Sequence, residues 1–259
     1  HGGTLDPFAS GVLPLLLGKA MKLTPLILKH QKTYIASFKL SSKSDLNEIK
    51  KAIKQFTGKI YNVPPEISAV KIQVRTRTIK KLKVLDFDGI NLLLEMECEA
   101  GTYVRTMARD LGLLLDAPVE LKELRRPSSG EFSLKQSVTM QQLADAHWLW
   151  KEKGDSDAIN RILHPLEDML SDVPRIVIKD GAAAALSHGA PLLRPGVVSI
   201  PEDLGVGSEV LLVTIKGEAV ALANLVQPSK VIPEMTQGEV AKPNCVLMKE
   251  DTYPRSWKK

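Results

Sequence analysis

The sequence contains little cysteine. Its 259 residues include only Cys98 and Cys245, which lie far apart and match no metal-ligand spacing. This usage excludes a disulfide-stabilised scaffold and a zinc-type motif, and it indicates a reducing cytosol. No apolar run is long enough to span a membrane. The first residues do not form a signal peptide, and the sequence lacks an initiator methionine. We therefore expect a cytoplasmic protein without a membrane anchor or a cysteine-based metal site.

The overall composition is that of an ordinary globular protein. Hydrophobic residues make up 44% and charged residues 25% of the chain, which is long enough for one large or two smaller domains. A net charge of +5 and a pI near 9.1 are mild. They permit a nucleic-acid partner without requiring one.

The first eighteen residues, HGGTLDPFASGVLPLLLG, carry a carboxylate on a tight loop. Glycines and the Asp6–Pro7 step punctuate the backbone there, which excludes a helix. The run from Val12 to Gly18 predicts a buried strand after the loop. Asp6 is then either a brace for the turn or a functional carboxylate at the edge of a sheet, and local chemistry leaves both open.

Residue patterning predicts strands and helices along most of the chain. The expected caps are Asp45 with Glu48, Thr139 with Gln142, and Thr102, while Gly58 ends a helix. Strands are expected at 32–40, 59–63, 69–74 and 119–125, with a hairpin of 84–87 and 90–99 around Asp88–Gly89. Helices are expected at 19–30 (kinked at Pro25), 44–57, 102–116, 139–151 and 165–170, with a loop at 151–157.

The pattern changes beyond Pro174. Short strands with frequent glycine and proline are expected at 175–178, 209–215, 218–226 and 245–249, with a short helix at 181–187. They predict a small barrel-like domain after a boundary near Asp172. We expect Trp148 and Trp150 to belong to a core rather than to an interface.

A stretch from Lys71 to Lys83 is basic and contains no acid. It is either a solvated strand face or an RNA contact, since phosphate binding needs such a surplus of positive charge. Arg105 falls in the first turn of the helix expected after Thr102, where the helix dipole disfavours a cation. It therefore needs an anion nearby, either a substrate phosphate or a carboxylate such as Asp6; a structural ion pair is the alternative.

Four motifs, GGTLDP, KTY, CEAGTYVRT and ELRRPSSG, occur in that order and resemble the pseudouridine synthases of the TruB family. The likeness is strongest to the archaeal dyskerin-like catalytic subunit of H/ACA guide ribonucleoproteins. The segment RIVIKDGAAAALSHGAPLLRPGV is similar to the start of a PUA domain. The resemblance implies an α/β (α+β) protein: a catalytic domain with a mixed, mostly antiparallel sheet at 1–172, a C-terminal PUA pseudo-barrel at 173–250, and a tail at 251–259.

The same resemblance implies roles for individual residues. Asp6 matches the catalytic aspartate, Tyr34 the tyrosine that stacks on the target base and acts on the C5 proton, and Arg105 the arginine that pairs with the aspartate. Residues 65–81 resemble a thumb loop that closes over RNA, and 181–195 the PUA surface that holds guide RNA. The implied substrate-binding residues are His1, Gly3, Thr4, Leu124, Lys71, Arg75 and Arg77; the implied guide-RNA contacts are Lys179, His188, Gly189 and Arg194.

The implied reaction converts uridine to pseudouridine without a metal or cofactor. Asp6 either attacks C1′ or assists a glycal-type intermediate, and the sequence leaves both open. The resemblance implies H/ACA guide RNA, ribosomal RNA and small partner proteins. A stand-alone enzyme for the TΨC-loop uridine of tRNA is the alternative, and a non-catalytic RNA-binding scaffold is the alternative of another class. Because family members carry some tens of residues before this loop, we expect a fragment with an exposed sheet edge and reduced stability.

Overall fold

A computed structural model describes residues 1–64 and 73–254, which divide into two compact units. Unit 1 comprises residues 1–16 and 23–144; unit 2 comprises residues 17–22 and the described chain from 145 onward. Lys71 and most of the strand expected at 69–74 lie outside the described residues. None of the described helices is long and apolar enough to cross a membrane.

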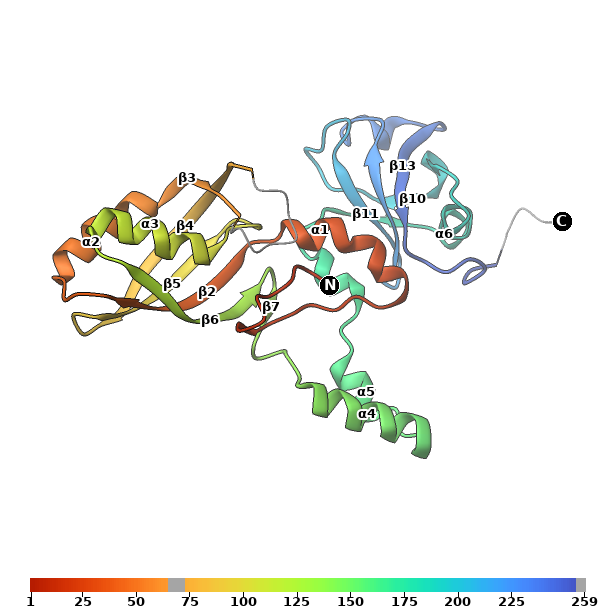
Figure 1. The fold of residues 1–259 in the computed structure, drawn as a ribbon. Helices are drawn as coiled ribbons and strands as arrows, with labels where there is room; N and C mark the ends of the chain where they lie inside the picture. Colours follow the sequence, from red (N-terminus) through yellow and green to blue (C-terminus); the bar gives the residue numbers. More distant parts are fainter. Residues whose placement is uncertain (65–72, 255–259) are drawn as a thin grey trace. The chain divides into compact units, whose positions relative to one another are not determined.

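Unit 1 is built on a mixed sheet covered on one face by two helices (Figure 1). In the described residues, β1 and β6 form its one parallel pair, and the remaining pairs are antiparallel. The expected mixed, mostly antiparallel sheet is confirmed. The strand order is β1 (Ser10–Gly11), β6 (Val119–Ser129), β2 (Lys32–Leu40), β5 (Asn91–Cys98), β4 (Arg75–Phe87) and β3 (Gly58–Asn62), with β7 (Phe132–Ser133) paired to β6.

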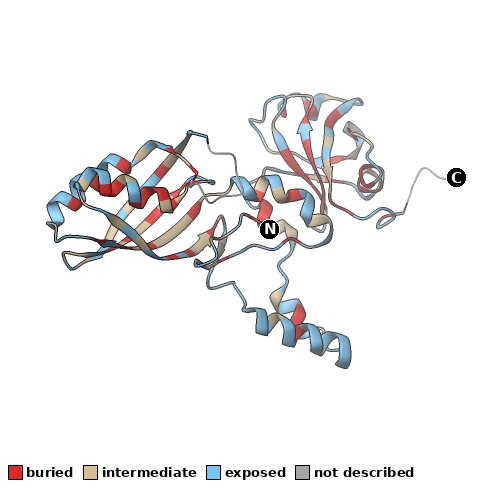
Figure 2. Cartoon of the chain, in the orientation of Figure 1, coloured by how far each residue is buried: buried red, intermediate tan, exposed pale blue. Residues whose placement is uncertain are grey.

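Helices α2 (Leu46–Phe56) and α3 (Val104–Leu115) pack on each other and on the sheet. Their apolar faces and the facing strand residues form one buried cluster, seen in red in Figure 2. Period-2 alternation in β2 places Ala36, Phe38 and Leu40 in this core. Tyr34 lies on the same face of β2, at the margin of the cluster. The helices thus cover the face that also carries Tyr34.

Unit 2 contains a second sheet around its own core. Its order is β10 (Val197–Ser199), β8 (Arg175–Ile178), β11 (Glu209–Thr214), β12 (Ala219–Leu225), β13 (Glu239–Val246) and β9 (Leu192–Leu193). Helix α6 (Asp180–Ser187) packs on strands of this sheet. The connecting turns are η2 (Leu166–Leu170), η3 (Arg194–Gly196) and η4 (Ile232–Glu234). The turn η1 (Gly18–Leu23) joins this unit through Lys19 and Lys22, whose ammonium groups donate to the Met248 and Val246 carbonyls.

Several local expectations are confirmed. Asp45 and Glu48 form a capping box at the start of α2. Thr139 and Gln142 exchange the corresponding bonds at the start of α4 (Met140–Lys153). The hairpin of β4 and β5 turns at Asp88–Gly89, where the Asp88 carboxylate accepts from three nitrogens. These features depend on neighbouring residues alone, which is why sequence could predict them.

The prediction of a buried strand at Val12–Gly18 is wrong. Leu13, Leu15 and Leu17 are exposed, and β1 ends at Gly11. Pro14 has no N–H for a ladder, and its carbonyl accepts from the Gly2 N–H at 2.9 Å. The segment therefore follows the loop instead of continuing the sheet.

The following helix also differs from expectation. The region 19–30 divides into η1 and the short helix α1 (Thr24–Lys29), with Pro25 in the first turn of α1. Pro25 therefore begins a helix instead of kinking one, because its missing N–H is not needed there.

Other boundaries need correction. Tyr103, not Thr102, is the N-cap of α3, because the Thr102 hydroxyl donates to the Glu99 carbonyl at 2.7 Å. Gly58 begins β3 after Thr57 ends α2. β6 runs on to Ser129, α4 runs into the expected loop as far as Lys153, and the last strand is 239–246 instead of 245–249.

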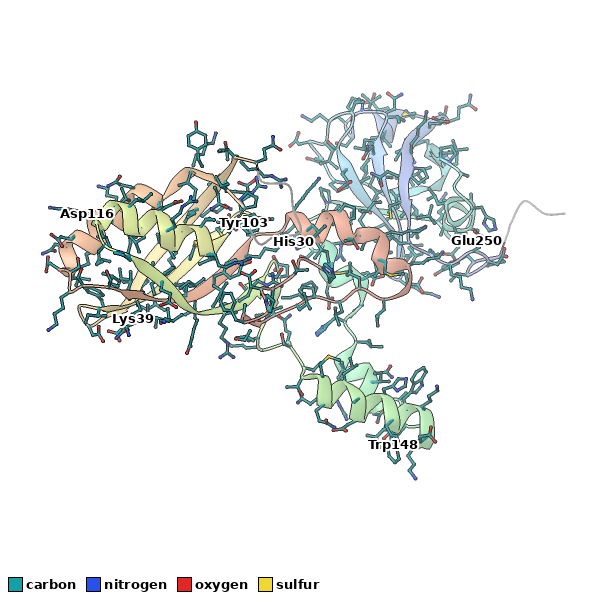
Figure 3. The ribbon with its side chains drawn as sticks, viewed as in Figure 1. His30, Lys39, Tyr103, Asp116, Trp148 and Glu250 are labelled. Carbon is teal, nitrogen blue, oxygen red and sulfur yellow. The ribbon has the colours of Figure 1, made fainter. Side chains whose placement is uncertain are left out.

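Trp148 and Trp150 are not core residues. Both lie on α4 and are about half exposed, at 53% and 50%, and Figure 3 shows Trp148 projecting from the helix. Lys153 lies over the Trp148 ring, and His147 contacts Trp150 edge-on. Helix α5 (Asp157–Ile162) follows α4. Local pattern could not distinguish an aromatic residue on a buried face from one on an open helix.

Candidate active site

Asp6 lies in a tight turn closed by its own carbonyl. The Ala9 N–H donates to the Asp6 carbonyl oxygen at 2.8 Å, with Pro7 at the second position of the turn. Gly3 before it adopts φ +110°, which favours glycine. The loop therefore presents the Asp6 carboxylate in a fixed, partly exposed position.

Arg105 reaches Asp6 from the first turn of α3. Its Nη2 donates to Asp6 Oδ1 at 2.7 Å, and both side chains are about a quarter exposed. The positive charge disfavoured by the helix N-terminus thus has a carboxylate partner, as the sequence required. The Nε of Arg105 is buried and has no hydrogen-bond partner among the described residues. The Arg105 guanidinium therefore has one N–H donor, at Nε, that the pair with Asp6 does not use.

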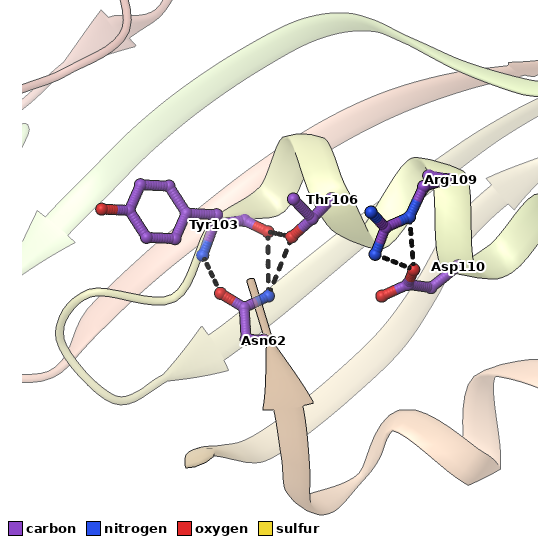
Figure 4. Close-up of polar contacts among 5 residues, drawn as sticks. All are labelled: Asn62, Tyr103, Thr106, Arg109 and Asp110. Atoms are coloured by element: carbon purple, nitrogen blue, oxygen red, sulfur yellow. Dashed lines mark hydrogen bonds and ion pairs between the residues drawn. The ribbon is translucent and has the colours of Figure 1, made fainter. Parts of the chain in front are cut away.

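Asn62, at the end of β3, holds the start of α3 (Figure 4). Its Oδ1 accepts from the Tyr103 N–H at 2.9 Å, and its Nδ2 donates to Thr106 Oγ1 at 2.9 Å and to the Tyr103 carbonyl at 3.3 Å. The side chain is almost completely buried. Asn62 thereby gives an acceptor to the N–H of the N-cap residue, although Tyr103 itself makes no side-chain cap.

Tyr34, on β2, is close enough to Asp6 for the carboxylate charge to act on its hydroxyl. Burial raises the pKa of the Tyr34 hydroxyl, the Arg126 guanidinium works against that rise, and the Asp6 charge adds to it. The hydroxyl is therefore neutral near neutral pH. Leu124, on the neighbouring strand β6, is buried in the same cluster and pairs with Ala36. The sequence thus identified Asp6, Arg105 and Tyr34, three polar side chains that the fold brings together.

Arg126 is a site residue that sequence reasoning missed. It is only 1% exposed, and its guanidinium donates to the carbonyls of Gly3, Thr4 and Val12 at 2.9, 3.3 and 2.8 Å. The adjacent Arg125 is exposed. The ELRRPSSG motif contains both arginines, and the alternation of strand faces was the signal that one of them points inward.

Lys32 is a second buried cation next to this loop. Its Nζ donates to the carbonyls of Ile27, Leu28 and His30 at 3.1, 3.3 and 2.5 Å. Burial, together with the charge of Arg126, lowers its pKa to about 8. Burial likewise raises the pKa of the Cys98 thiol to about 11. The pKa of the Lys32 ammonium and that of the Cys98 thiol thus both lie away from their ordinary values.

The remaining residues expected to bind substrate are less enclosed. His1 and Thr4 are exposed, and the Thr4 backbone serves the loop as an acceptor. On β4, Arg75 is partly exposed, and the Arg77 guanidinium packs over Gly101, whose φ is +77°. Arg77 Nη1 donates to the Thr76 carbonyl at 2.8 Å, and its buried Nε has no partner among the described residues.

The residues expected to contact guide RNA gather at the ends of α6 and the turn after it. Lys179 is the exposed N-cap of α6. His188 ends the helix, with Nδ1 3.0 Å from the Ala184 carbonyl and Nε2 3.5 Å from Asp251. Gly189 follows with φ +86°. The Arg194 guanidinium donates to the Ile232 and Pro233 carbonyls at 2.6 and 3.2 Å, which occupies part of its donor set.

Comparison with known proteins assigns most of the chain to three family models. Residues 1–104 match the model of the TruB family pseudouridylate synthase N-terminal domain, and 105–171 match the tRNA pseudouridylate synthase B C-terminal domain. Residues 174–247 match the PUA domain. These matches define an enzyme that modifies RNA.

Similar proteins cover the whole chain. A probable tRNA pseudouridine synthase B of Methanosarcina acetivorans is 40% identical over 100% of this chain and 77% of its own length. A protein of the same description from Methanocaldococcus jannaschii is 39% identical over 100% and 77%. The chain belongs to the TruB family, and it is a pseudouridine synthase, an isomerase that acts on RNA.

Solved structures give the same fold. A chain in an H/ACA ribonucleoprotein bound to a substrate RNA containing 2′-deoxyuridine has a TM-score of 0.87 and 34% identity, covering 99% of this chain and 78% of that chain. A chain in a Cbf5–Nop10–Gar1 complex has a TM-score of 0.85 and 36% identity, covering 98% and 78%. The expected resemblance to the archaeal dyskerin-like subunit, with its PUA domain, is confirmed.

Proposed function

We propose that Asp6, Tyr34 and Arg105 carry the isomerisation of uridine to pseudouridine. The observation that supports this most is the 2.7 Å Arg105–Asp6 pair, whose carboxylate charge also acts on the Tyr34 hydroxyl. The reaction breaks the C1′–N1 bond, turns the freed uracil, and forms a C1′–C5 bond. The proton lost from C5 is balanced by one gained at N1, so the product is an isomer.

Each of the three residues has a chemical role in this proposal. The Asp6 carboxylate acts at C1′, either as a nucleophile or by helping to form a glycal. Arg105 supplies the positive charge that keeps this carboxylate stable once RNA excludes water. Tyr34 stacks on the extruded base, which offsets the lost stacking in RNA, and acts on the C5 proton. Leu124 lines the uracil pocket.

For the substrate we propose RNA selected by an H/ACA guide. This is supported by the likeness, across both units, to chains solved within H/ACA ribonucleoproteins. The implied partners are a guide RNA, a ribosomal RNA target and small proteins such as the Nop10 and Gar1 of those complexes. Contacts to RNA are proposed for the substrate-side set His1, Gly3, Thr4, Lys71, Arg75 and Arg77 and for the PUA set Lys179, His188, Gly189 and Arg194.

A second candidate is stand-alone modification of tRNA. It is favoured by the descriptions of the 40% identical relatives, which are tRNA pseudouridine synthases B. We further propose a cytoplasmic location. The domain boundary near Asp172 remains a proposal, supported by family matches that end at 171 and begin at 174.

Tritium release from RNA labelled at uracil C5 tests these proposals. One arm contains a tRNA transcript and the protein alone; the other contains a guide–target pair with guide RNA and partner proteins. Release only in the second arm supports guided activity, and release from tRNA alone supports the stand-alone enzyme. D6N removes the carboxylate and should abolish release in the productive arm.

D110N is the matched control for D6N. Asp110 also pairs with an arginine, Arg109, at 2.6 Å and has a side chain that is 26% exposed, but it lies further along α3. It should release tritium at the wild-type rate. Equal release by D6N and wild type would overturn the assignment of Asp6. No release in either arm would support the non-catalytic scaffold.

A further inference from the structure

A buried arginine closes both ends of the loop that carries Asp6. Three donors of Arg126 are bound to the carbonyls of Gly3 and Thr4, before Asp6, and of Val12, after it. The described residues give this guanidinium carbonyl partners and no carboxylate. A buried charge without a counter-charge is costly, and here the guanidinium offsets that cost by donating to three loop carbonyls that an apolar residue would leave without a donor. The charge therefore has a use beyond packing.

The backbone of Arg126 holds the same loop. The Val12 N–H donates to the Arg126 carbonyl at 2.8 Å, and Gly11 pairs with Arg126 in the parallel β1–β6 ladder. The approach is so close that a Cβ on Gly11 would lie 2.2 Å from the Arg126 carbonyl oxygen. Gly11 also has φ +117°, a conformation that other residues rarely adopt. Side chain and main chain of one residue thus fix the loop on both sides of Asp6.

The same residue lies opposite Tyr34. In the antiparallel β2–β6 ladder, Thr33 pairs with Ser128 but Ile35 pairs with Arg125, so β6 has one extra residue at Arg126–Pro127. Such a bulge re-aims side chains and is common next to active sites. Pro127 has no N–H for the ladder, which explains why the bulge falls there. Arg126 is therefore placed between the Asp6 loop and the tyrosine.

We propose that Arg126 is a positioning residue that holds the Asp6 loop and the Tyr34 hydroxyl in their reactive arrangement. The proposal rests on the function proposed for Asp6 and Tyr34. Arg126 acts through these two groups without touching RNA, since its guanidinium is buried and bonds to the loop. Its loss should therefore lower the rate of the chemical step and leave RNA affinity unchanged.

R126K tests this, because lysine keeps the charge but replaces the three donor nitrogens, each of which bonds a different loop carbonyl, with a single ammonium group. With saturating enzyme and whichever RNA the wild type converts, we expect the single-turnover rate constant to fall about 10²-fold, the cost of a displacement near 1 Å. The RNA dissociation constant should stay at the wild-type value. R125K, the same substitution at the adjacent exposed position, should match wild type in both.

Hydrogen exchange provides a readout that does not need activity. In R126K the amides of Ala9 and Val12, which donate to Asp6 and Arg126, should lose protection. The amides within α2 should keep theirs. In a double variant with R105K, the rate loss should be less than the product of the two single losses, because both act through Asp6.

Several outcomes would overturn the proposal. One is a wild-type rate constant with a smaller active fraction, which would make Arg126 a folding residue only. Another is a weakened RNA affinity with an unchanged rate constant. If R126K does not fold, G11A is the second variant, because its Cβ would push the loop away from the Arg126 backbone. G11A must then show the loss of rate with an unchanged RNA dissociation constant. If the wild type converts no RNA, the proposed function fails, while unchanged exchange at Ala9 in R126K would refute the inference separately.

Discussion

The side chain of Asn62 binds both main-chain polar groups of Tyr103, accepting from its N–H at 2.9 Å and donating to its carbonyl at 3.3 Å. Tyr103 is the N-cap of α3, and its own side chain makes no cap. Arg105 follows two residues later. The first turn of α3, and with it the direction from which Arg105 meets Asp6, therefore depends on a residue from β3.

N62A should lower both stability and activity. It leaves the Tyr103 N–H without an acceptor, which costs about 1–3 kcal/mol in the free energy of unfolding, while the Thr106 hydroxyl keeps its bond to the Tyr103 carbonyl. N62D keeps the acceptor and places a negative charge at the helix N-terminus, so its loss should be smaller. Urea unfolding and single-turnover conversion measure the two effects. N47A, at an exposed asparagine on α2, is the control; an N62A variant as stable as N47A would contradict the prediction.

The capping box of α2 should matter for stability alone. D45A removes the acceptor for the Asn47 N–H, which is 2.9 Å away, and should cost about 1 kcal/mol. D45N should be nearly neutral, because asparagine caps as well as aspartate. Helix α2 packs on α3, β3 and β4, and the hydrogen bonds of Asp45 stay within the capping box, so the rate of conversion should not change. A loss of rate in folded D45A would show that α2 is coupled to the site.

Sequence predicted the parts of the site that depend on local patterns and motifs. The alternation of Lys32–Leu40 gave the bounds of β2, and the unfavourable position of Arg105 at a helix start required an anion, which Asp6 supplies. The order of the four motifs predicted the TruB family, and the segment after Pro174 predicted the PUA domain.

Features that depend on distant parts of the chain could not be predicted. Arg126 is buried because the loop returns to it through Gly3 and Val12, and Asn62 caps a helix 41 residues away. The leucines after Val12 suggested a strand by composition, but Pro14 and the Gly2 contact set a different path. In each case the partner that decides the structure is remote in sequence.

Lys32 should make stability depend on pH in the alkaline range. Burial lowers its pKa to about 8 from an ordinary 10.5, so between these values the unfolded chain binds more protons than the folded one. The free energy of unfolding should therefore rise with pH through this window, by on the order of 1 kcal/mol. Thermal melts between about pH 7 and 9.5 of wild type and K32M measure it, since K32M removes the titrating group.

K39M is the control for that experiment, because Lys39 lies on the same strand with an exposed side chain (Figure 3). It should keep the wild-type pH dependence, whereas K32M should flatten it. A wild-type curve that falls with pH relative to K32M would reverse the sign and contradict the assignment of a lowered pKa to Lys32.

In unit 2, the Tyr253 hydroxyl donates to the Glu218 carboxylate, which also accepts from Thr214 Oγ1 at 2.8 Å. These bonds lower the pKa of Glu218, and the bond to Glu218 raises the pKa of Tyr253. The Tyr253–Glu218 hydrogen bond anchors the C-terminal segment, whose Leu247 and Met248 amides donate to the Val220 carbonyl. Y253F should therefore speed hydrogen exchange of those two amides near neutral pH.

The effect of Y253F should have a defined pH window. Because the folded pKa of Glu218 is lowered, the stabilisation is present above its ordinary pKa and is lost as the pH falls through the lowered pKa of the folded state. It is also lost at alkaline pH, once the Tyr253 hydroxyl ionises. Wild type and Y253F should thus differ most between these limits. Y61F, at a tyrosine 78% exposed, should exchange like wild type, and a Y253F difference that grows at acid pH would refute the role of the ionised Glu218.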